Sequence, residues 1–316
     1  MRARAKPATR PTVRELIAHG ARRFARARLF FGHGTDNAWD EAAALVWHAL
    51  GLPGSAGAEV YGRRVDRARV AVAEALFARR IAERQPAAYL TQTMYFAGLP
   101  FHVDDRVLVP RSPIAELIER RFAPWITPSR VRRVLDLGTG SGCIAIACAR
   151  AFPRARIDAV DISEAALEVA GINVRRHRLT RRVRLVKSDH FAALGASTYD
   201  IIVSNPPYVA ERELAGLPRE YGHEPRIALA AGAEGLDSVS VILAEAYRHL
   251  RPRGILIVEV GNSERALQRR FPRLPFLWLA FERGGGGVFL LGREQLGTAS
   301  PRAEARRLPG AGRKKA

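Results

Sequence analysis

A glycine-rich turn lies between an apolar strand and an apolar helix near the middle of the chain. Residues 132–137 have the pattern of a buried strand, the turn is Asp136-Leu137-Gly138-Thr139-Gly140-Ser141-Gly142, and the helix continues to about Arg150. Glycines let the backbone approach a ligand closely, and a helix N-terminus presents N–H groups to it. The turn therefore predicts an α/β sheet that binds a ligand at this strand's carboxyl end. Dinucleotide folds use a similar turn, so the ligand stays open.

Two further predicted strands end in polar residues. Ile157 to Val160 ends on Asp161, and Val183 to Val186 is followed by Ser188-Asp189-His190-Phe191. A carboxylate such as Asp161 can accept both hydroxyls of a ribose, in nucleosides of several kinds. Asp189, which precedes flat side chains, can receive an adenine amino group and ring. A helix cap is the alternative role for Asp189.

The next predicted strand, Ile201 to Val203, runs into Asn205-Pro206-Pro207-Tyr208. Prolines lack an N–H group and have a fixed φ, so they hold the carbonyls of Asn205 and Pro206 rigidly outward. A rigid pair of acceptors suits a planar NH2 group, which has two hydrogens to donate. Tyr208 adds an aromatic face beside that pair. A Pro-Pro turn with a packing tyrosine is the alternative interpretation.

The remaining pattern completes the fold class. We expect a helix from Leu236 to Leu250, a strand from Ile255 to Val260, and a closing pair at 276–282 and 288–291 around Gly284 to Gly287. Residues 114–292 are therefore predicted to form an α/β domain, with a seven-stranded, mostly parallel sheet and flanking helices. Apolar spacings of three and four predict a small all-helical domain at 12–88, and turn signals predict a hairpin linker at 89–113.

Amino-acid composition limits the kinds of partner and surroundings that suit this protein. The formal charge is +20, from 51 basic and 31 acidic side chains, and the two ends of the chain supply half of it. We expect residues 1–11 and 293–316 to be basic, disordered arms. This balance suits surroundings rich in nucleic acid, although a high-GC coding bias would produce part of it. We expect a cytoplasmic protein, because the chain has neither an apolar run of membrane length nor a secretory signal.

Two cysteines, Cys143 and Cys148, are five residues apart in one apolar helix. This is not a metal-ligand spacing, and we expect both to be core residues. We expect no bound metal.

The order of these motifs resembles the S-adenosylmethionine-dependent class I methyltransferases that act on planar amino nitrogens. The resemblance rests on D-L-G-T-G-S-G, an acidic residue after the second strand, an aspartate after the third, and N-P-P-Y after the fourth. Two groups of enzymes share that tetrapeptide. One methylates exocyclic amino groups of nucleic-acid bases, and the other methylates glutamine side-chain amides in proteins of the translation apparatus.

Residues 224–232, E-P-R-I-A-L-A-A-G, resemble the E-P-x-x-A-L-x-x-G signature of the HemK-like protein glutamine methyltransferases. Release-factor enzymes of this family usually carry R-P-acid-T-E, where this chain has Arg111-Ser112-Pro113-Ile114-Ala115-Glu116. Together with F-F-G-H-G-T-D-N-A-W-D-E at 30–41 and G-G-G-G-V-F at 284–289, the chain resembles the PrmB-type branch. That branch methylates a glutamine of large-subunit ribosomal protein L-three. The resemblance covers about residues 12–292 and neither basic tail.

The resemblance implies a role for each motif. Asp136, Gly138, Thr139, Gly140, Ser141 and Gly142 form the expected site for the methionine end of S-adenosylmethionine. Asp161 is implied for its ribose and Asp189 with His190 for its adenine, although release-factor relatives tend to have tryptophan where His190 stands. Asn205, Pro206, Pro207 and Tyr208 are the implied catalytic residues. The helical domain is implied in substrate recognition. The charge of the basic tails, which the resemblance does not cover, suits non-specific rRNA contact, and solvated tails without a partner are the alternative.

The expected chemistry follows from the substrate. An amide nitrogen is a poor nucleophile, so the site must align nitrogen, methyl and sulfur and accept the amide hydrogens on the Asn205 side-chain oxygen and the Pro206 carbonyl. Tyr208 is expected to place its π face near the methylsulfonium. Three alternatives remain open: a release-factor substrate, a nucleic-acid amino group, and a non-catalytic RNA-binding or assembly factor. Broken motifs would favour the last, and none is broken.

Overall fold

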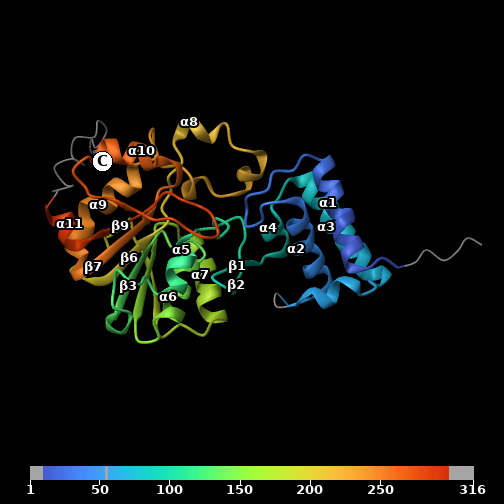
Figure 1. The fold of residues 1–316 in the computed structure, drawn as a ribbon, viewed down its shortest axis with the longest axis horizontal. Helices are drawn as coiled ribbons and strands as arrows, with labels where there is room; N and C mark the ends of the chain where they lie inside the picture. The colour runs from blue at the N-terminus through green and yellow to red at the C-terminus, as the bar shows by residue number, and fades with distance from the viewer. Residues whose placement is uncertain (1–9, 54–55, 299–316) are drawn as a thin grey trace, which may run out of the picture. The chain divides into compact units, whose positions relative to one another are not determined.

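The computed structural model describes residues 10–53 and 56–298 (Figure 1). The chain forms two compact units. The first, here called the helical unit, contains residues through Thr93 together with Pro218–His223, and the second, the sheet unit, contains Met94–Leu217 and the chain from Glu224 onward. The helical unit thus differs from the expected 12–88, because it runs further and takes in a short segment from much later in the sequence.

Helices make up the helical unit. Its elements are α1 (Val13–Arg26), α2 (Ala38–Leu50), the 3-10 helix η1 (Ala58–Gly62), α3 (Arg67–Glu83), α4 (Ala87–Thr91) and the 3-10 helix η3 (Arg219–His223). Thr12 and Glu15 form a capping box at α1, and Asn37 caps α2 by accepting a hydrogen bond from the backbone N–H of Asp40 at 2.9 Å. The apolar faces of α1, α2 and α3 pack together around Phe77, which is fully buried.

A buried charge network holds η3 in the helical unit. The Arg80 guanidinium is fully buried, and its Nε donates to Glu41 Oε1 at 2.7 Å. Arg80 Nη1 also lies 3.5 Å from Glu220 Oε1. Glu220 accepts from the Phe30 backbone N–H at 3.0 Å and from Arg84 Nη1 at 3.2 Å. Glu220 is 2 % exposed, so each of these bonds operates with little screening by water.

The segment at 30–41 supplies the surface on which η3 lies. The Phe30 and His33 rings both contact the Tyr221 ring, with centroid separations of 5.8 and 4.6 Å. His223 completes the attachment, because its Nε2 lies 2.8 Å from the Glu83 carbonyl oxygen. The F-F-G-H motif therefore has a packing role within this unit.

The sheet unit begins with a hairpin of β1 (Met94–Phe96) and β2 (Leu99–Phe101). This hairpin lies inside the segment 89–113 that was expected to be a linker, whereas residues 89–93 belong to the helical unit. The strands of its main sheet are β3 (Arg133–Leu137), β4 (Arg156–Asp161), β5 (Val183–Lys187), β6 (Tyr199–Ser204), β7 (Leu250–Glu259), β8 (Leu277–Trp278) and β9 (Val288–Gly292). Their order is β5-β4-β3-β6-β7-β9-β8, and β9 is antiparallel to both neighbours. The predicted seven-stranded, mostly parallel sheet is confirmed within the described residues.

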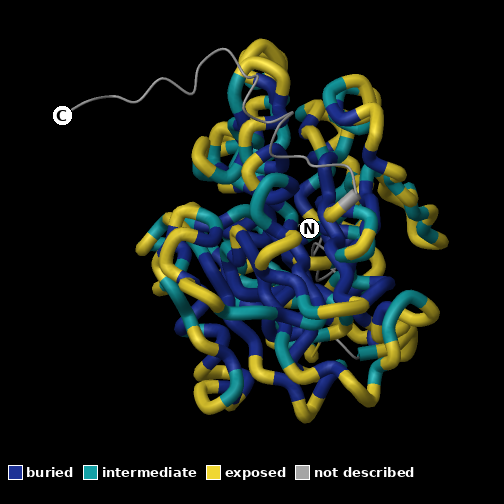
Figure 2. Tube along the Cα trace, turned by 90° about the vertical axis from the view of Figure 1, so that its left-hand side faces the viewer, coloured by how far each residue is buried: buried dark blue, intermediate teal, exposed yellow. Residues whose placement is uncertain are grey.

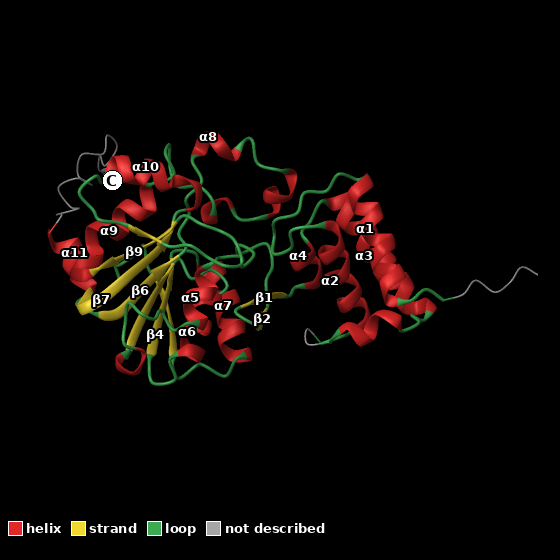
Figure 3. Cartoon of the chain, viewed as in Figure 1, coloured by secondary structure: helices red, strands yellow, loops and turns green. Residues whose placement is uncertain are grey.

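Helices cover both faces of this sheet (Figures 1 and 3). One layer contains α5 (Ile114–Glu119), α6 (Cys143–Ala151) and α7 (Glu164–Arg176), and the other contains α9 (Asp237–His249), α10 (Glu264–Arg270) and α11 (Arg293–Thr298). The remaining short elements are η2 (Pro128–Arg130), α8 (Glu211–Leu214), η4 (Arg226–Ala228) and η5 (Gly261–Ser263).

Alternate residues of the central strands bury their side chains under the α9–α11 layer. Leu135 and Leu137 of β3 and Leu256 and Val258 of β7 belong to one cluster there, each no more than 1 % exposed. Figure 2 shows that buried segments gather in the interior and that exposed segments surround them. On the other face, Cys143 and Cys148 are buried, free thiols of α6, which confirms the prediction that they are core residues.

The C-terminal boundary expected at residue 293 is wrong. Arg293–Thr298 form α11, in which Leu296 is 1 % exposed and packs in the core of the sheet unit. Arg293 Nε donates to the Leu250 carbonyl at 2.8 Å, and its guanidinium lies 4.1 Å from the Tyr247 ring centre. The rest of the expected tail, and residues 1–9 of the expected arm, lie outside the described residues. No helix in the described part of the chain is long and apolar enough to cross a membrane.

We expect Glu220→Gln to destabilise the helical unit by about 3 kcal/mol, because the change removes the charge that faces two arginines in a buried site. Hydrogen–deuterium exchange should rise in residues 218–223 and around Phe30. Asp36→Asn is the matched control, since Asp36 is an exposed acid of the same unit. Equal exchange in the two variants would contradict the role given to Glu220.

Candidate active site

A cavity of about 660 Å³ lies at the carboxyl ends of β3, β4, β5 and β6. In the sheet order, β4 and β5 lie on one side of β3, whereas β6 and β7 lie on its other side. Chain connections that leave in opposite directions open a crevice at such a point, and ligands of α/β sheets bind there. The cavity therefore occupies the position that the glycine turn predicts.

The glycine turn forms one wall of the cavity. Gly138, Gly140 and Gly142 have φ values of +69°, +53° and +80°, a region that side chains disfavour. Asp136 fastens the turn from beneath, because its Oδ2 accepts from the Thr139 hydroxyl at 2.6 Å and from the Ala145 N–H at 3.0 Å. Asp136 is fully buried, and this raises its pKa to about 7; the charge of Asp161 adds to the rise, whereas the two hydrogen bonds oppose it.

Asp161 lies where β4 ends and lines the cavity. Its Oδ2 accepts from the Gly140 N–H at 2.8 Å and its Oδ1 from the Ser163 N–H at 2.9 Å. Burial raises the pKa of Asp161 above its ordinary value, against these two hydrogen bonds, which lower it. Additional donors, such as a pair of ligand hydroxyls, would stabilise the ionised carboxylate in this position.

Asp189 and His190 follow β5 at the other end of the cavity. His190 has a φ of +46°, and its two ring nitrogens lie 2.6 Å from Asp189 Oδ1 and 2.7 Å from the Ser238 hydroxyl. The imidazole orientation is therefore set from both sides. The Asp189 side chain is 68 % exposed, so it has room to receive a ligand donor.

The Asn205 loop lies against the glycine turn. The Ser204 hydroxyl donates to the Leu137 carbonyl at 2.7 Å, which joins the ends of β6 and β3. A Cβ atom at Gly138 would lie 3.9 Å from both the Asn205 carbonyl oxygen and Pro206 Cα. The Asn205 side-chain oxygen is buried and has no hydrogen-bond partner among the described residues. A buried acceptor without a donor is costly, so this atom is suited to a ligand N–H.

The Tyr208 side chain contacts residues that support the loop and does not line the cavity. Its hydroxyl donates to Glu259 Oε1 at 3.2 Å, and the Ser112 hydroxyl donates to the other Glu259 oxygen at 2.5 Å. The Tyr208 ring packs on Gly261, where a Cβ atom would come within 2.7 Å of it. Burial raises the pKa of Glu259, although both hydrogen bonds lower it.

The glycine run at 284–287 supports the same place. The Val260 N–H donates to the Gly287 carbonyl at 2.7 Å, and a side chain at Gly287 would overlap the Gly261 backbone. Gly287 also has a φ of +66°. Glycine is required here because two backbone segments meet directly beneath the tyrosine of the N-P-P-Y motif.

The E-P-x-x-A-L-x-x-G segment braces the loop from the opposite direction. Glu224, whose side chain is fully buried, accepts from Arg111 Nη1 at 2.5 Å and Nη2 at 2.8 Å, and from the Val109 N–H at 3.1 Å. Further along, Val209 exchanges backbone hydrogen bonds with Leu229 and Ala231. These bonds fix the backbone that continues from Tyr208.

The structure brings most of the predicted site residues to one cavity. Its walls include Gly138, Thr139, Gly140, Ser141, Asp161, Asp189, His190, Asn205, Pro206 and Pro207. Asp136, Gly142 and Tyr208 are not among the lining residues: the first two shape the glycine turn, and Tyr208 supports the Asn205 loop.

Sequence reasoning missed the contribution of α9. Ser238, Val241, Glu245 and His249 line the cavity, at spacings of three and four along one side of that helix. Val241, with Ile162 and Ile227, belongs to the few large apolar side chains that are exposed, and all three line the cavity. An apolar residue directly after Asp161 was the available signal for Ile162.

These residues fit S-adenosylmethionine. The cavity volume is in the range of small-molecule sites, at roughly 300–1,000 Å³. Apolar Ile162 and Val241 suit a base, the Asp161 carboxylate suits a ribose, and the turn at Gly138–Ser141 suits the amino-acid end. The orphaned Asn205 oxygen then remains for the group that is to be methylated.

We expect Asp136→Asn to change how stability depends on pH. Between its ordinary value of 3.8 and about 7, the folded protein holds a proton on Asp136 that the unfolded chain has lost. The free energy of unfolding therefore falls as pH rises through that interval, and asparagine removes this loss. Urea unfolding at a series of pH values should show the variant gaining on the native protein up to about pH 7. A constant difference across the interval would contradict the buried, protonated carboxyl.

A family described as "Methyltransferase small domain" matches residues 120–217. The chain is 48% identical over 286 residues to the "Ribosomal protein uL3 glutamine methyltransferase" of Neisseria meningitidis serogroup B, covering 90% of this chain and 94% of the relative. A relative with the same name from Bordetella pertussis is 48% identical over 291 residues, covering 91% and 97%.

Among solved structures, the "hMettl16 catalytic domain in complex with MAT2A 3'UTR hairpin 1" matches with a TM-score of 0.50 at 17% identity, covering 79% of this chain and 91% of that one. This likeness shows the methyltransferase fold. The identity to the curated relatives extends over nearly the whole chain and includes both units. The protein therefore belongs to the family of ribosomal protein uL3 glutamine methyltransferases, with S-adenosylmethionine as the methyl donor.

Proposed function

We propose that this protein transfers a methyl group from S-adenosylmethionine to the side-chain amide nitrogen of a glutamine in ribosomal protein uL3, the large-subunit protein L-three. The observation that carries the proposal is the buried Asn205 side-chain oxygen, which has no hydrogen-bond partner in the part of the chain that the structure describes and lies at the wall of a cavity that fits this cofactor. The names of relatives at 48% identity support the choice of substrate.

The chemistry needs acceptors more than a base. The lone pair of an amide nitrogen is delocalised into its carbonyl, and no side chain of ordinary pKa can deprotonate it beforehand. When bound, S-adenosylmethionine supplies an electrophilic methyl group on a positively charged sulfur. Asn205 Oδ1 and the Pro206 carbonyl accept the two amide hydrogens, which orients the nitrogen and stabilises positive charge as it develops there. The C–S bond breaks as the N–C bond forms, the sulfur leaves as a neutral thioether, and one amide hydrogen is released to solvent as a proton.

Rigid support makes these acceptors effective, because they do not have to reorganise during the reaction. Pro206 and Pro207 restrict the backbone, and the Ser204 hydroxyl ties it to β3. Tyr208 acts here as a positioning residue through Glu259 and Gly261. This replaces the expectation that its ring faces the methyl group.

Different residues bind the methionine end, the ribose and the adenine of S-adenosylmethionine. The glycine turn from Gly138 to Ser141 holds the methionine end through its backbone, with Asp136 and Gly142 shaping that turn. Asp161 binds the ribose hydroxyls. Asp189 receives the adenine amino group, and His190, held by Ser238, lies against the ring.

The helical unit is the proposed site for recognising the substrate protein. The chain passes from the Asn205 loop into Pro218–His223 of that unit and returns at Glu224, which holds Arg111. A substrate bound by the helical unit can thereby influence the loop through a short covalent connection. We also propose contact of the basic termini with rRNA and a cytoplasmic location, which suit a ribosomal substrate; both termini lie outside the described residues.

Transfer of labelled methyl from S-adenosylmethionine to purified uL3, a release factor and RNA tests the proposal, with mass spectrometry to locate the product. We expect label on a glutamine of uL3 alone. Asn205→Ala should lower turnover by about 100-fold or more while cofactor binding persists, since an oriented acceptor is lost.

Asn262→Ala is the control for that variant, because Asn262 is exposed and does not line the cavity. Label on the release factor or on RNA would overturn the substrate. Undiminished turnover in Asn205→Ala would overturn the acceptor role of Asn205.

For Asp161→Ala we expect the opposite pattern, an affinity for S-adenosylmethionine at least about tenfold lower with an intact fold, because two hydrogen bonds to a carboxylate are lost. Calorimetric titration measures the affinity, and circular dichroism checks the fold. Asp105→Asn is the control, since Asp105 is an exposed acid that does not line the cavity. An unchanged affinity in Asp161→Ala would remove Asp161 from the ribose site.

A further inference from the structure

A surface rich in arginine lies at the amino ends of the strands, at the opposite end of the sheet from the cavity. Residues 175–184, R-R-H-R-L-T-R-R-V-R, contain six arginines and no acid. With 51 basic residues in 316, an even spread would place about one or two in such a stretch. A compositional bias toward arginine therefore does not account for this density. The stretch spans the end of α7, the following turn and the start of β5.

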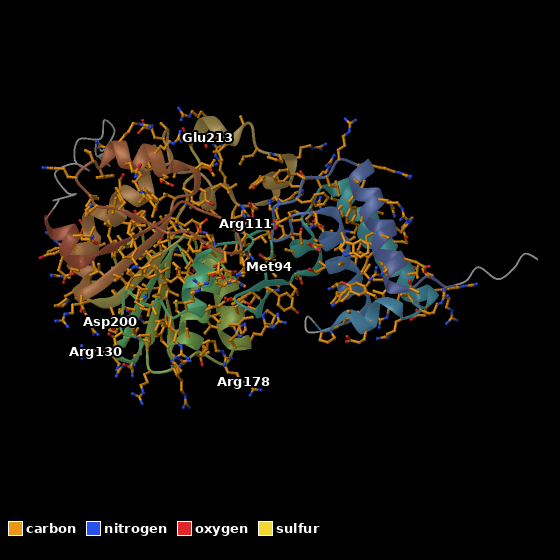
Figure 4. The ribbon with its side chains drawn as sticks, viewed as in Figure 1. Met94, Arg111, Arg130, Arg178, Asp200 and Glu213 are labelled. Carbon is orange, nitrogen blue, oxygen red and sulfur yellow. The ribbon has the colours of Figure 1, made fainter. Side chains whose placement is uncertain are left out.

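Strand pairing brings further arginines to this turn. The Ile157 N–H donates to the Arg182 carbonyl at 2.8 Å, and Arg133 of β3 pairs in register with Arg156 of β4. We call the resulting surface the arginine edge. It consists of Arg130, Arg132, Arg133, Arg154, Arg156, Arg178, Arg181, Arg182 and Arg184. These residues lie at or near the amino ends of strands whose carboxyl ends form the cavity, and Figure 4 shows Arg130 and Arg178 at the lower rim.

Two acids at this edge are already engaged. Asp158 is buried and is held by Arg133 Nη2 at 3.1 Å, Arg184 Nε at 2.8 Å and the Tyr199 hydroxyl at 2.7 Å. Asp200 accepts from the backbone N–H groups at 132 and 133 and from Arg251. Neither carboxylate is available to neutralise the remaining arginines.

Several guanidinium groups are left uncompensated. Arg154, Arg156, Arg178 and Arg181 are exposed, and within residues 10–53 and 56–298 their side chains form no hydrogen bond or ion pair.

The edge is also hollowed. A groove of about 540 Å³ is lined by Arg133, Arg156, Arg181, Arg182 and Arg184 together with Asp158. Guanidinium groups offer paired N–H donors whose spacing matches phosphate oxygens. None of the large apolar side chains that are exposed in the described residues belongs to this edge, so it lacks the feature by which proteins insert into membrane surfaces.

We propose that the arginine edge binds the phosphate backbone of RNA. The choice of RNA rests on the proposed function, since the proposed substrate is a protein that assembles with ribosomal RNA. Backbone contacts of this kind require no base readout. Because the edge is opposite the cavity, bound RNA leaves the Asn205 loop open to the substrate glutamine.

Binding of the full-length protein to a labelled RNA duplex of about 20 base pairs tests this, with fluorescence anisotropy at several salt concentrations. The edge variant is Arg154→Glu, Arg156→Glu, Arg181→Glu. The matched control is Arg22→Glu, Arg265→Glu, Arg269→Glu, whose arginines are exposed and scattered over α1 and α10. Both variants lower the formal net charge from +20 to +14 and retain the basic termini.

We expect the edge variant to lose RNA affinity by about tenfold or more, and the magnitude of the slope of log affinity against log salt to fall by about 3. The control variant with scattered changes should keep most of its RNA affinity and most of its salt dependence. Equal losses in the two variants would overturn the proposal in favour of diffuse attraction. Binding to phosphatidylglycerol vesicles that requires the edge, with RNA binding that does not, would overturn it in favour of a membrane.

Methyl transfer to free uL3 separates this proposal from the proposed function. The edge variant should methylate free uL3 at the native rate, because the edge does not line the cavity. Absence of transfer in the native protein would overturn the proposed function while the RNA comparison stands. If thermal melting shows the edge variant to be unstable, Arg→Gln changes at the same three positions provide the same comparison with a smaller charge change.

Discussion

The parallel pairing of β3 with β6 is the constraint on which the active site depends. It places Leu137 beside Ser204, and the Ser204 hydroxyl locks the two strand ends together. The glycine turn follows one strand and Asn205 follows the other, so this register places the backbone of the glycine turn beside the backbone of Asn205 and Pro206. A slip of one residue would turn Asn205 to the other face of the sheet. The apolar layers under α6 and α9 hold that register.

Around this junction the protein buries several acids, and each has a separate structural reason. Asp136 ties the glycine turn to α6, Glu259 anchors Tyr208, and Glu224 holds Arg111. None of these three lines the cavity. They form a support whose hydrogen bonds fix the backbone of the groups that do. Preorganisation of this kind suits methylation of an amide, where alignment contributes more than acid–base chemistry.

The two ends of the sheet have opposite character. At the carboxyl ends, Asp161 and Asp189 face a cavity for a small cofactor, whereas at the amino ends arginines outnumber the acids and face solvent. In a parallel sheet the same strands form both ends of the sheet. One fold can therefore carry a reaction at the carboxyl ends and an electrostatic contact at the amino ends. The buried Arg80–Glu220 network has a separate role. It holds Pro218–His223, whose neighbours in sequence belong to the sheet unit, within the helical unit.

Much of this could be predicted from local pattern. Short apolar runs that end in Asp161, Asp189 and Asn205 predicted the strands and the edge at which they end, because side-chain periodicity and proline rules act over a few residues. Other features depend on residues far apart in the chain. The contact of Tyr208 with Gly261 requires β7 to lie beside β6, and the placement of η3 in the helical unit requires Glu220 to meet Arg80. The sequence alone thus determined the strands, the turns and the chemistry of the motifs, whereas pairing between distant segments decided which of those residues reach the cavity.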